Sequence, residues 1–191
     1  MLANESLYES NWENEILKFI QVLYPQYVLC KKQARVKDTE GKIRKIDLLL
    51  GNSEGNVDIL EIKRPSIPHI LTKTNSYRDN YVPLRELSGS IMQCEKYIYY
   101  LLKGGQTAET ALNKQYSKEL PTGYQLHIIN PKAIIIIGRS NNFTKQEIKD
   151  FEIIRRKYKN IIDIITYDDL INRFETAIKF YELNKLKEQP Q

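Results

Sequence analysis

Residues 43–63 read IRKIDLLLGNSEGNVDILEIK, and this stretch decides the fold. Two apolar runs, at 46–50 and 57–62, flank a segment rich in turn-forming residues, which is the pattern of two antiparallel strands joined by a short loop. In a hairpin that is symmetric about Glu54, residues whose numbers sum to 108 face each other, so Asp47 lies opposite Glu61. The stretch therefore predicts a hairpin that brings two acidic side chains together.

The second strand of this hairpin carries the pattern Glu61-Ile62-Lys63. Side chains alternate along a strand, so Glu61 and Lys63 share one face while Ile62 points into the core. Opposed carboxylates at Asp47 and Glu61 repel each other unless a cation lies between them. Mg²⁺ prefers such oxygen ligands and lowers the pKa of a bound water. We expect Asp47 and Glu61 to bind the metal, and Lys63 to hold the attacking water or stabilise negative charge in phosphodiester hydrolysis.

The Glu-x-Lys pattern alone is weak evidence, because it also occurs at Glu40-Gly41-Lys42 and Glu147-Ile148-Lys149. The first of these is centred on a glycine in a turn, and the second is at the start of a helix. Asp58 is an alternative to Asp47, although it points away from Glu61 in a regular strand. A simpler interpretation is that the three hairpin residues are exposed edge-strand charges, since a register shift of one residue turns every side chain to the other face.

The rest of the chain predicts further helices and strands in alternation. Apolar residues at helical spacing predict helices over residues 12–25, 84–102, 144–157 and from about 168 to 180. Short apolar runs predict strands at 133–137 and 161–166, and residues 31–37 are compatible with another. Gly104 and Gly105 are expected to end the long helix, and residues 66–83 and 106–124 to form irregular connections. This order predicts an α/β fold with a mixed central sheet flanked by helices, in a single domain over residues 1–191 with a frayed tail at 183–191.

Composition narrows the class of function. Of the 191 residues, 41% are hydrophobic and 28% are charged, and no apolar run approaches the roughly 18 residues of a membrane span. Cys30 and Cys94 each lie in an apolar segment, and the N-terminal residues do not resemble a secretory signal, so we expect a cytoplasmic protein with reduced thiols. The net charge of +5 favours a polyanionic partner such as DNA. Ligand spacings typical of zinc sites, phosphate-binding glycine loops and serine-hydrolase elbows do not occur in the sequence.

Other residues are candidates for the same site. Glu15 on the first helix, with Glu13 as the alternative, is a candidate for a further acidic position. Gln93 and Tyr97 are four residues apart and share one face of the long helix. Possible DNA contacts are Arg64, Lys73, Tyr77, Arg78, Tyr81 and Tyr97. Solvated surface positions and ordinary core packing explain these residues equally well.

In order and spacing, these residues resemble the Shedu nuclease family of bacterial anti-phage defence, whose core is a restriction-endonuclease-like PD-(D/E)XK domain. The matching pieces are residues 45–50, 60–65, 86–97, 136–139 and 165–170. The resemblance implies that Asp47, Glu61 and Lys63 occupy the metal and catalytic positions, Gln93 the helix glutamine position and Glu15 the N-terminal acidic position.

The resemblance also implies a DNA endonuclease that depends on Mg²⁺, with Mn²⁺ as a substitute, and that assembles into a homo-oligomer, either a dimer or a tetramer. Many members of the family carry an N-terminal regulatory region, which we expect this chain to lack. Two alternatives stay open. In the first alternative, the chain is a catalytically silent DNA-binding domain on the same fold. In the second, it is a regulatory scaffold whose charged hairpin mediates oligomerisation.

Overall fold

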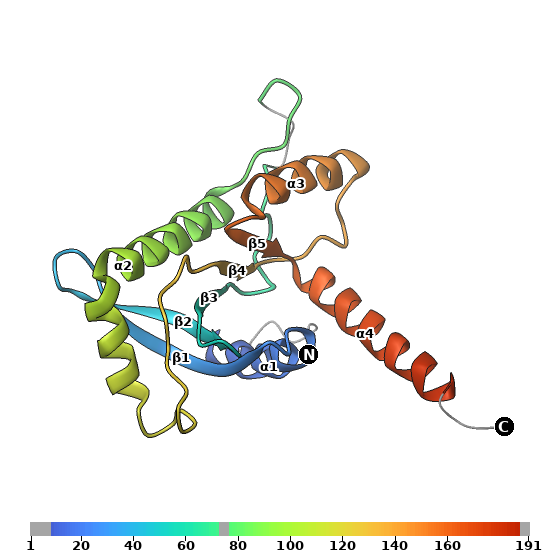
Figure 1. Ribbon diagram of the computed structural model, residues 1–191. Coiled ribbons are helices and arrows are strands. Elements are labelled where there is room, and N and C mark those ends of the chain that lie inside the picture. Colours follow the sequence, from blue (N-terminus) through green and yellow to red (C-terminus); the bar gives the residue numbers. More distant parts are fainter. Residues whose placement is uncertain (1–8, 73–76, 188–191) are drawn as a thin grey trace.

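The computed structural model describes residues 9–72 and 77–187, and the side chains of residues 16–72 and 77–183. It has a five-stranded mixed sheet flanked by helices, so the expected α/β class is confirmed (Figure 1). The helices are α1 (Glu9–Leu23), α2 (Arg85–Tyr116), α3 (Lys145–Tyr158) and α4 (Tyr167–Lys187). The strands are β1 (Tyr27–Lys37), β2 (Ile43–Asn52), β3 (Val57–Ile62), β4 (Ala133–Ile136) and β5 (Ile162–Ile165).

The strands lie in the sheet in the same order as in the sequence. β1, β2 and β3 pair antiparallel, whereas β3, β4 and β5 pair parallel. Between β2 and β3 the pairs include Leu48 with Leu60 and Gly51 with Val57, whose numbers sum to 108. The predicted hairpin register is therefore confirmed for the paired residues.

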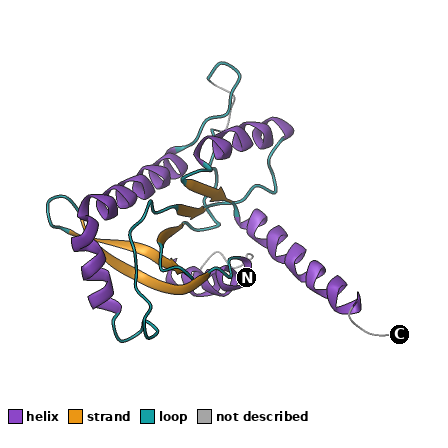
Figure 2. Ribbon diagram, viewed as in Figure 1, coloured by secondary structure: helices purple, strands orange, loops and turns teal. Residues whose placement is uncertain are grey.

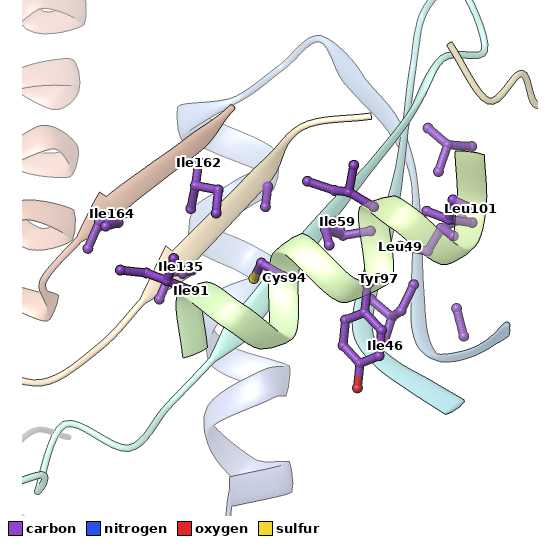
Figure 3. Close-up of a cluster of buried hydrophobic side chains, with 14 of the residues drawn as sticks. Ile46, Leu49, Ile59, Ile91, Cys94, Tyr97, Leu101, Ile135, Ile162 and Ile164 are labelled. Atoms are coloured by element: carbon purple, nitrogen blue, oxygen red, sulfur yellow. The ribbon is translucent and has the colours of Figure 1, made fainter. Parts of the chain in front are cut away.

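Helices cover both faces of the sheet, which creates two hydrophobic cores (Figure 2). The α2 core lies between the sheet and helices α2 and α3, and Figure 3 shows Ile91 and Cys94 of α2 against Ile135 of β4. The α1 core lies on the other face, where α1 and α4 pack against residues such as Leu60 and Ile62. Because neighbouring strand residues point to opposite faces, β4 is buried on both sides, as its run of isoleucines predicts.

Helix α2 differs from the sequence-based expectation at Gly105. The backbone there is non-helical (φ 46°, ψ −131°), but the helix resumes and continues to Tyr116. A glycine adopts this left-handed φ without the steric cost of a Cβ atom. Leu112 and Tyr116 are buried in the α2 core, so the second part of the helix is stabilised by packing. The glycines therefore bend the helix rather than end it, and the expectation of an irregular segment is wrong for residues 106–116.

The other boundaries differ little from expectation. Helix α1 ends two residues before Pro25, and β1 begins at Tyr27. The capping box before α3 is confirmed, since Thr144 Oγ1 accepts a hydrogen bond from the Glu147 backbone and Glu147 Oε2 accepts one from the Thr144 backbone. The backbone of α4 continues to Lys187, past the expected start of the tail. In the described residues, no helix has both the length and the apolar character to cross a membrane.

Candidate active site

The site begins where β2 and β3 separate. The ladder between these strands ends at the pair Leu48 and Leu60. On its other edge, β3 stays paired with β4 as far as Ile62. At this point the side chain of Asp47 replaces the backbone of β2, because Asp47 Oδ2 accepts a hydrogen bond of 2.9 Å from the Ile62 backbone N–H. The carboxylate of Asp47 is therefore fixed next to the Glu61–Ile62 peptide.

Strand β1 is irregular at the same level. Gln33 has a φ of 50°, and the ladder between β1 and β2 skips from Lys32–Leu48 to Ala34–Ile46. On β2, Ile46 belongs to the α2 core although Leu48, two residues later, belongs to the α1 core. The alternation of side chains along β2 is therefore interrupted at Asp47, because in a regular strand residues two apart point to the same face of the sheet.

Glu61 and Lys63 form an ion pair at the end of β3. Glu61 is 1% exposed, and Lys63 Nζ lies 2.6 Å from Glu61 Oε1. Glu61 follows Val57 and Ile59 on the face of the α2 core, while Leu60 and Ile62 point to the α1 core. The expectations that Ile62 points into a core and that Glu61 and Lys63 share a face both agree with this geometry.

A chain of hydrogen bonds connects Lys63 to helix α2. Lys63 Nζ donates to Gln93 Oε1 at 3.5 Å, and Gln93 Nε2 donates to the Tyr97 hydroxyl at 3.1 Å. The Tyr97 hydroxyl in turn donates to the Lys45 carbonyl oxygen at 2.7 Å. Because an ammonium group only donates hydrogen bonds, the amide oxygen of Gln93 has to face Lys63, and the tyrosine stabilises that orientation.

The backbone of Lys63 is held from two elements. Its N–H donates to the Ile136 carbonyl oxygen of β4 at 2.8 Å. Its carbonyl oxygen accepts a hydrogen bond of 2.9 Å from the hydroxyl of Tyr167, the first residue of α4. These contacts fix the point from which the lysine side chain extends toward Glu61 and Gln93.

The charges of the site reach two neighbouring groups on α2. Burial raises the pKa of the Cys94 thiol well above its ordinary value, and the carboxylates of Glu61 and Asp47 raise it further. Burial also raises the pKa of the Tyr97 hydroxyl, and the same two carboxylates contribute. Both carboxylates therefore lie close to the same turn of α2, and the thiol and the phenol are held in their neutral forms.

The donor set of the site fits a hard divalent cation. No group of three His, Cys, Asp or Glu side chains suited to a metal ion occurs in the chain as far as the structure describes it. Mg²⁺ commonly binds through one or two carboxylates and keeps several water ligands, whereas structural zinc sites need four protein ligands. The two carboxylates of Asp47 and Glu61 match the number of protein ligands that Mg²⁺ commonly uses.

A surface depression of about 320 Å³ lies between α2 and Arg44 of β2. Gln93 and Tyr97 form part of its wall, together with Tyr100 and the basic residues Arg44 and Lys96. Sequence reasoning did not single out Lys96, although its spacing of three residues from Gln93 and four from Tyr100 places it on the same helix face. It also gave Tyr167 no part in the site, although this residue lies in the matching piece 165–170.

The other sequence candidates lie elsewhere. Asp58 accepts hydrogen bonds from the Tyr27 hydroxyl and the Lys132 backbone, on the face away from Glu61. Arg64, Tyr77 and Arg78 are exposed, and Tyr81 is half-buried with its backbone N–H bonded to Asp150. Glu13 and Glu15 lie in α1 with side chains outside the described part of the chain, and Lys73 lies outside it altogether. The structure thus brings together Asp47, Glu61, Lys63, Gln93 and Tyr97.

Comparisons with known proteins agree with the earlier resemblance. The family model "Shedu protein SduA, C-terminal" matches residues 6–171 of the chain. The Shedu protein SduA of Bacillus cereus (strain B4264) is 29% identical over 149 residues, which cover 77% of this chain and 37% of that relative's length. Since the family model spans most of the chain, the protein belongs to the Shedu SduA family, in the C-terminal region that the model represents.

Proposed function

We propose that the protein is a metal-dependent DNA endonuclease with a PD-(D/E)XK core, and that Asp47, Glu61 and Lys63 form its active centre. The observation that carries the proposal is the ion pair of the buried Glu61 with the half-buried Lys63, near the carboxylate of Asp47. Burying charged groups costs free energy that an apolar pair would not, so such groups are more easily explained by chemistry than by stability. Gln93, which accepts a hydrogen bond from Lys63, also lines a surface depression.

Each residue has a separate part in this mechanism. Asp47 and Glu61 supply oxygen ligands for Mg²⁺ or Mn²⁺, which when bound polarises the phosphate and lowers the pKa of a water molecule. Lys63 places its ammonium group where it stabilises negative charge that grows on the phosphoryl oxygens or orients the attacking water. Gln93 positions that ammonium group through its amide oxygen. Glu15 is proposed as the further acidic residue of the site on the resemblance alone.

DNA as the substrate is supported by charge. The chain has a net charge of +5, and Arg44 and Lys96 lie in the depression next to Gln93. Basic side chains that contact phosphates bring a polyanion to the site and release its counterions. Arg64, Lys73, Tyr77 and Arg78 stay proposed as additional DNA contacts, and Tyr97 contributes through its position in the wall of the depression. A role in cytoplasmic anti-phage defence, as the resemblance implies, is part of the proposal.

Self-association is also part of the proposal. Helix α4 leads away from the rest of the molecule (Figure 1), and it exposes Ile178, Phe180, Tyr181 and Leu183. Exposed apolar side chains gathered on one helix are typical of protein interfaces. A second copy of the chain would cover them in a dimer or tetramer. Sedimentation of the purified protein at several concentrations tests this, and a monomer at all concentrations contradicts it.

The alternative of a catalytically silent DNA-binding domain is supported by the small number of acidic ligands. Only two carboxylates meet in the described part of the site, and a third would bind a cation more firmly. This alternative predicts DNA binding without cleavage under any divalent cation. It is separated from the leading proposal by measurement of binding and cleavage on the same preparation.

Plasmid cleavage with Mg²⁺ and with Mn²⁺ tests the nuclease proposal. Glu61→Gln and Lys63→Ala are each expected to lower the rate by about 100-fold or more, because charge stabilisation and proton transfer contribute factors of that order. The chain offers a matched control in the same Glu-x-Lys pattern, since Glu40 and Lys42 form an exposed ion pair in the turn between β1 and β2. Glu40→Gln and Lys42→Ala should cleave like the wild type. Equal rates for both sets of folded variants contradict the proposal.

A further inference from the structure

A second and larger hollow lies farther along α2. Its volume is about 490 Å³, and it is formed between the tip of the β1–β2 hairpin and α2 on both sides of Gly105. Its wall includes Val36 and Ile43 from the hairpin and Leu101, Ala108 and Leu112 from the helix. None of these residues takes part in the candidate active site.

The two hollows are adjacent. Tyr100 belongs to the walls of both hollows. On β2, Arg44 lines the first hollow and its neighbour Ile43 lines the second. On the helix, Gln93, Lys96, Tyr100 and Gly104 follow one another at spacings of three and four residues, so they lie on one face. We call the two hollows together the α2 groove. It begins at Gln93, which contacts Lys63, and runs roughly 16 Å along the helix axis to the bend, at 1.5 Å for each residue.

The charge of the α2 groove is positive. Lys96 and Arg44 line its first part, and Lys103, Lys37 and Arg35 line the second. Among the described residues that line it, Asp38 is the acidic one. Its carboxylate already accepts hydrogen bonds from Arg44 and from the Glu40 and Lys42 backbone, which neutralises it and also orients the Arg44 guanidinium. An anionic chain with regularly spaced charges matches this arrangement.

The floor of the groove suits the other part of a nucleotide. Tyr100 is half-buried between the two hollows, and the wall beyond it is mainly apolar. Nucleobases stack on aromatic side chains and bury apolar surface, whereas the phosphates stay near lysine and arginine. A base within a duplex is stacked on its neighbours and does not reach such a floor, so a single strand fits better than a double helix.

From these observations we infer that the α2 groove binds one strand of the nucleic acid beyond the scissile phosphate. Lys96 and Lys103 contact successive phosphates, and Tyr100 stacks on a base that enters the apolar hollow. The inference rests on the proposed nuclease function, because it takes the scissile phosphate to lie at Lys63. It adds that the enzyme requires a locally unpaired strand on that side of the cut.

Binding without metal tests the groove separately from catalysis. The full chain is titrated in EDTA against a fluorescent single-stranded oligonucleotide and against a blunt duplex of the same sequence, with anisotropy as the readout. Lys96→Glu combined with Lys103→Glu is expected to weaken single-strand binding at least tenfold. The slope of log affinity against log salt should fall by about 0.7 for each lost phosphate contact. Lys145→Glu combined with Lys149→Glu, at two exposed sites on α3, makes the same charge change and is the matched control, which should have a much smaller effect.

The base contact has its own variant. Tyr100→Leu keeps the apolar character but removes the aromatic ring, so it should weaken binding of the single strand about tenfold and leave the blunt duplex unchanged. Equal losses for both probes overturn the single-strand inference. Wild-type affinity in the Lys96/Lys103 variant, or a loss no greater than that of the α3 double variant, overturns the groove itself.

The two proposals fail in different ways. If the groove variants weaken binding but no divalent cation supports cleavage, the nuclease proposal fails and the binding site stands. If cleavage depends on Glu61 and Lys63 while the groove variants bind normally, only the groove inference fails. If the wild type binds neither probe in EDTA, the groove inference fails, and plasmid cleavage with Mg²⁺ still decides the nuclease proposal.

Discussion

The hydroxyl group of Tyr167 donates a hydrogen bond of 2.9 Å to the backbone carbonyl oxygen of Lys63. Tyr167 is 2% exposed, and its own backbone N–H is bonded to the carbonyl oxygen of Gly138. The start of α4 therefore fixes the end of β3 at the residue that supplies the ammonium group of the site. Through this contact, helix α4 fixes the position of the Lys63 backbone, although α4 supplies none of the metal or catalytic side chains.

Loss of this hydroxyl should affect cleavage more than binding. We expect Tyr167→Phe to lower the cleavage rate about tenfold at saturating DNA, because Lys63 is displaced, and to leave DNA affinity in EDTA unchanged. The cost in stability should be about 1 kcal/mol, the usual contribution of one hydrogen bond. Tyr124→Phe is the matched control, since its hydroxyl donates to the Asn52 carbonyl oxygen at the other end of the hairpin. Equal loss of cleavage in both variants would show that Tyr167 is important only for stability.

Gln93 is expected to act through Lys63. Its amide oxygen faces the ammonium group, so Gln93→Ala should lower cleavage by about tenfold. In a Lys63→Ala background the same substitution should have almost no effect, because the group it positions is absent. The measurement is a double-mutant cycle on cleavage rates with Mn²⁺. Additive losses would mean that Gln93 contacts the substrate or the metal directly.

The site was predictable from the sequence where its contacts are local. The turn-forming residues 51–56 fix the register between β2 and β3 as far as the pair Leu48 and Leu60, which leaves Asp47 next to the end of β3. Gln93 and Tyr97 were recognisable as a pair because a helix brings residues four apart together. In both cases a few neighbouring residues contain the whole signal.

The rest depends on contacts between distant segments. Tyr167 and Lys63 are 104 positions apart, and no pattern near either residue indicates their hydrogen bond. β3 also pairs with β4, which begins at Ala133, and the hairpin sequence does not indicate this contact. Gly104 and Gly105 resemble a helix end, but the burial of Leu112 and Tyr116 stabilises the continuation of α2. Packing thus overrides the local signal.

Metal binding should stabilise the folded protein through Asp47 and Glu61. Addition of Mn²⁺ at 100 times its Kd is expected to add about 2.7 kcal/mol to the free energy of unfolding, and EDTA should reverse the effect. At roughly 2–4 °C for each kcal/mol in a domain of this size, the rise in Tm is readily measured. Glu61→Gln should lose this rise, whereas Glu40→Gln in the exposed turn should keep it. An equal rise in both variants would place the cation elsewhere.

Asp168 is expected to make the stability of the fold depend on pH. Partial burial opposes ionisation of this carboxyl group, but hydrogen bonds from Arg139 and from the Ser140 and Asn141 backbone outweigh it and hold its pKa below the ordinary 3.8. A carboxyl group with a lowered pKa in the folded state stabilises that state above its ordinary pKa. The contribution is lost as the pH falls through the folded-state pKa.

Asp168→Asn should therefore lower the free energy of unfolding by about 1–3 kcal/mol at neutral pH, the range for hydrogen bonds to a charged group. Urea unfolding of both proteins should give the same difference at pH 7 and pH 5, and a smaller one below about pH 3.8, where the wild-type carboxyl group becomes protonated in the unfolded chain. Asp79→Asn, in the exposed β3–α2 connection, serves as the control for a general effect of removing one negative charge. A difference for Asp168→Asn that stays constant down to pH 2 would mean that the ionised carboxylate does not hold the 139–141 segment to α4.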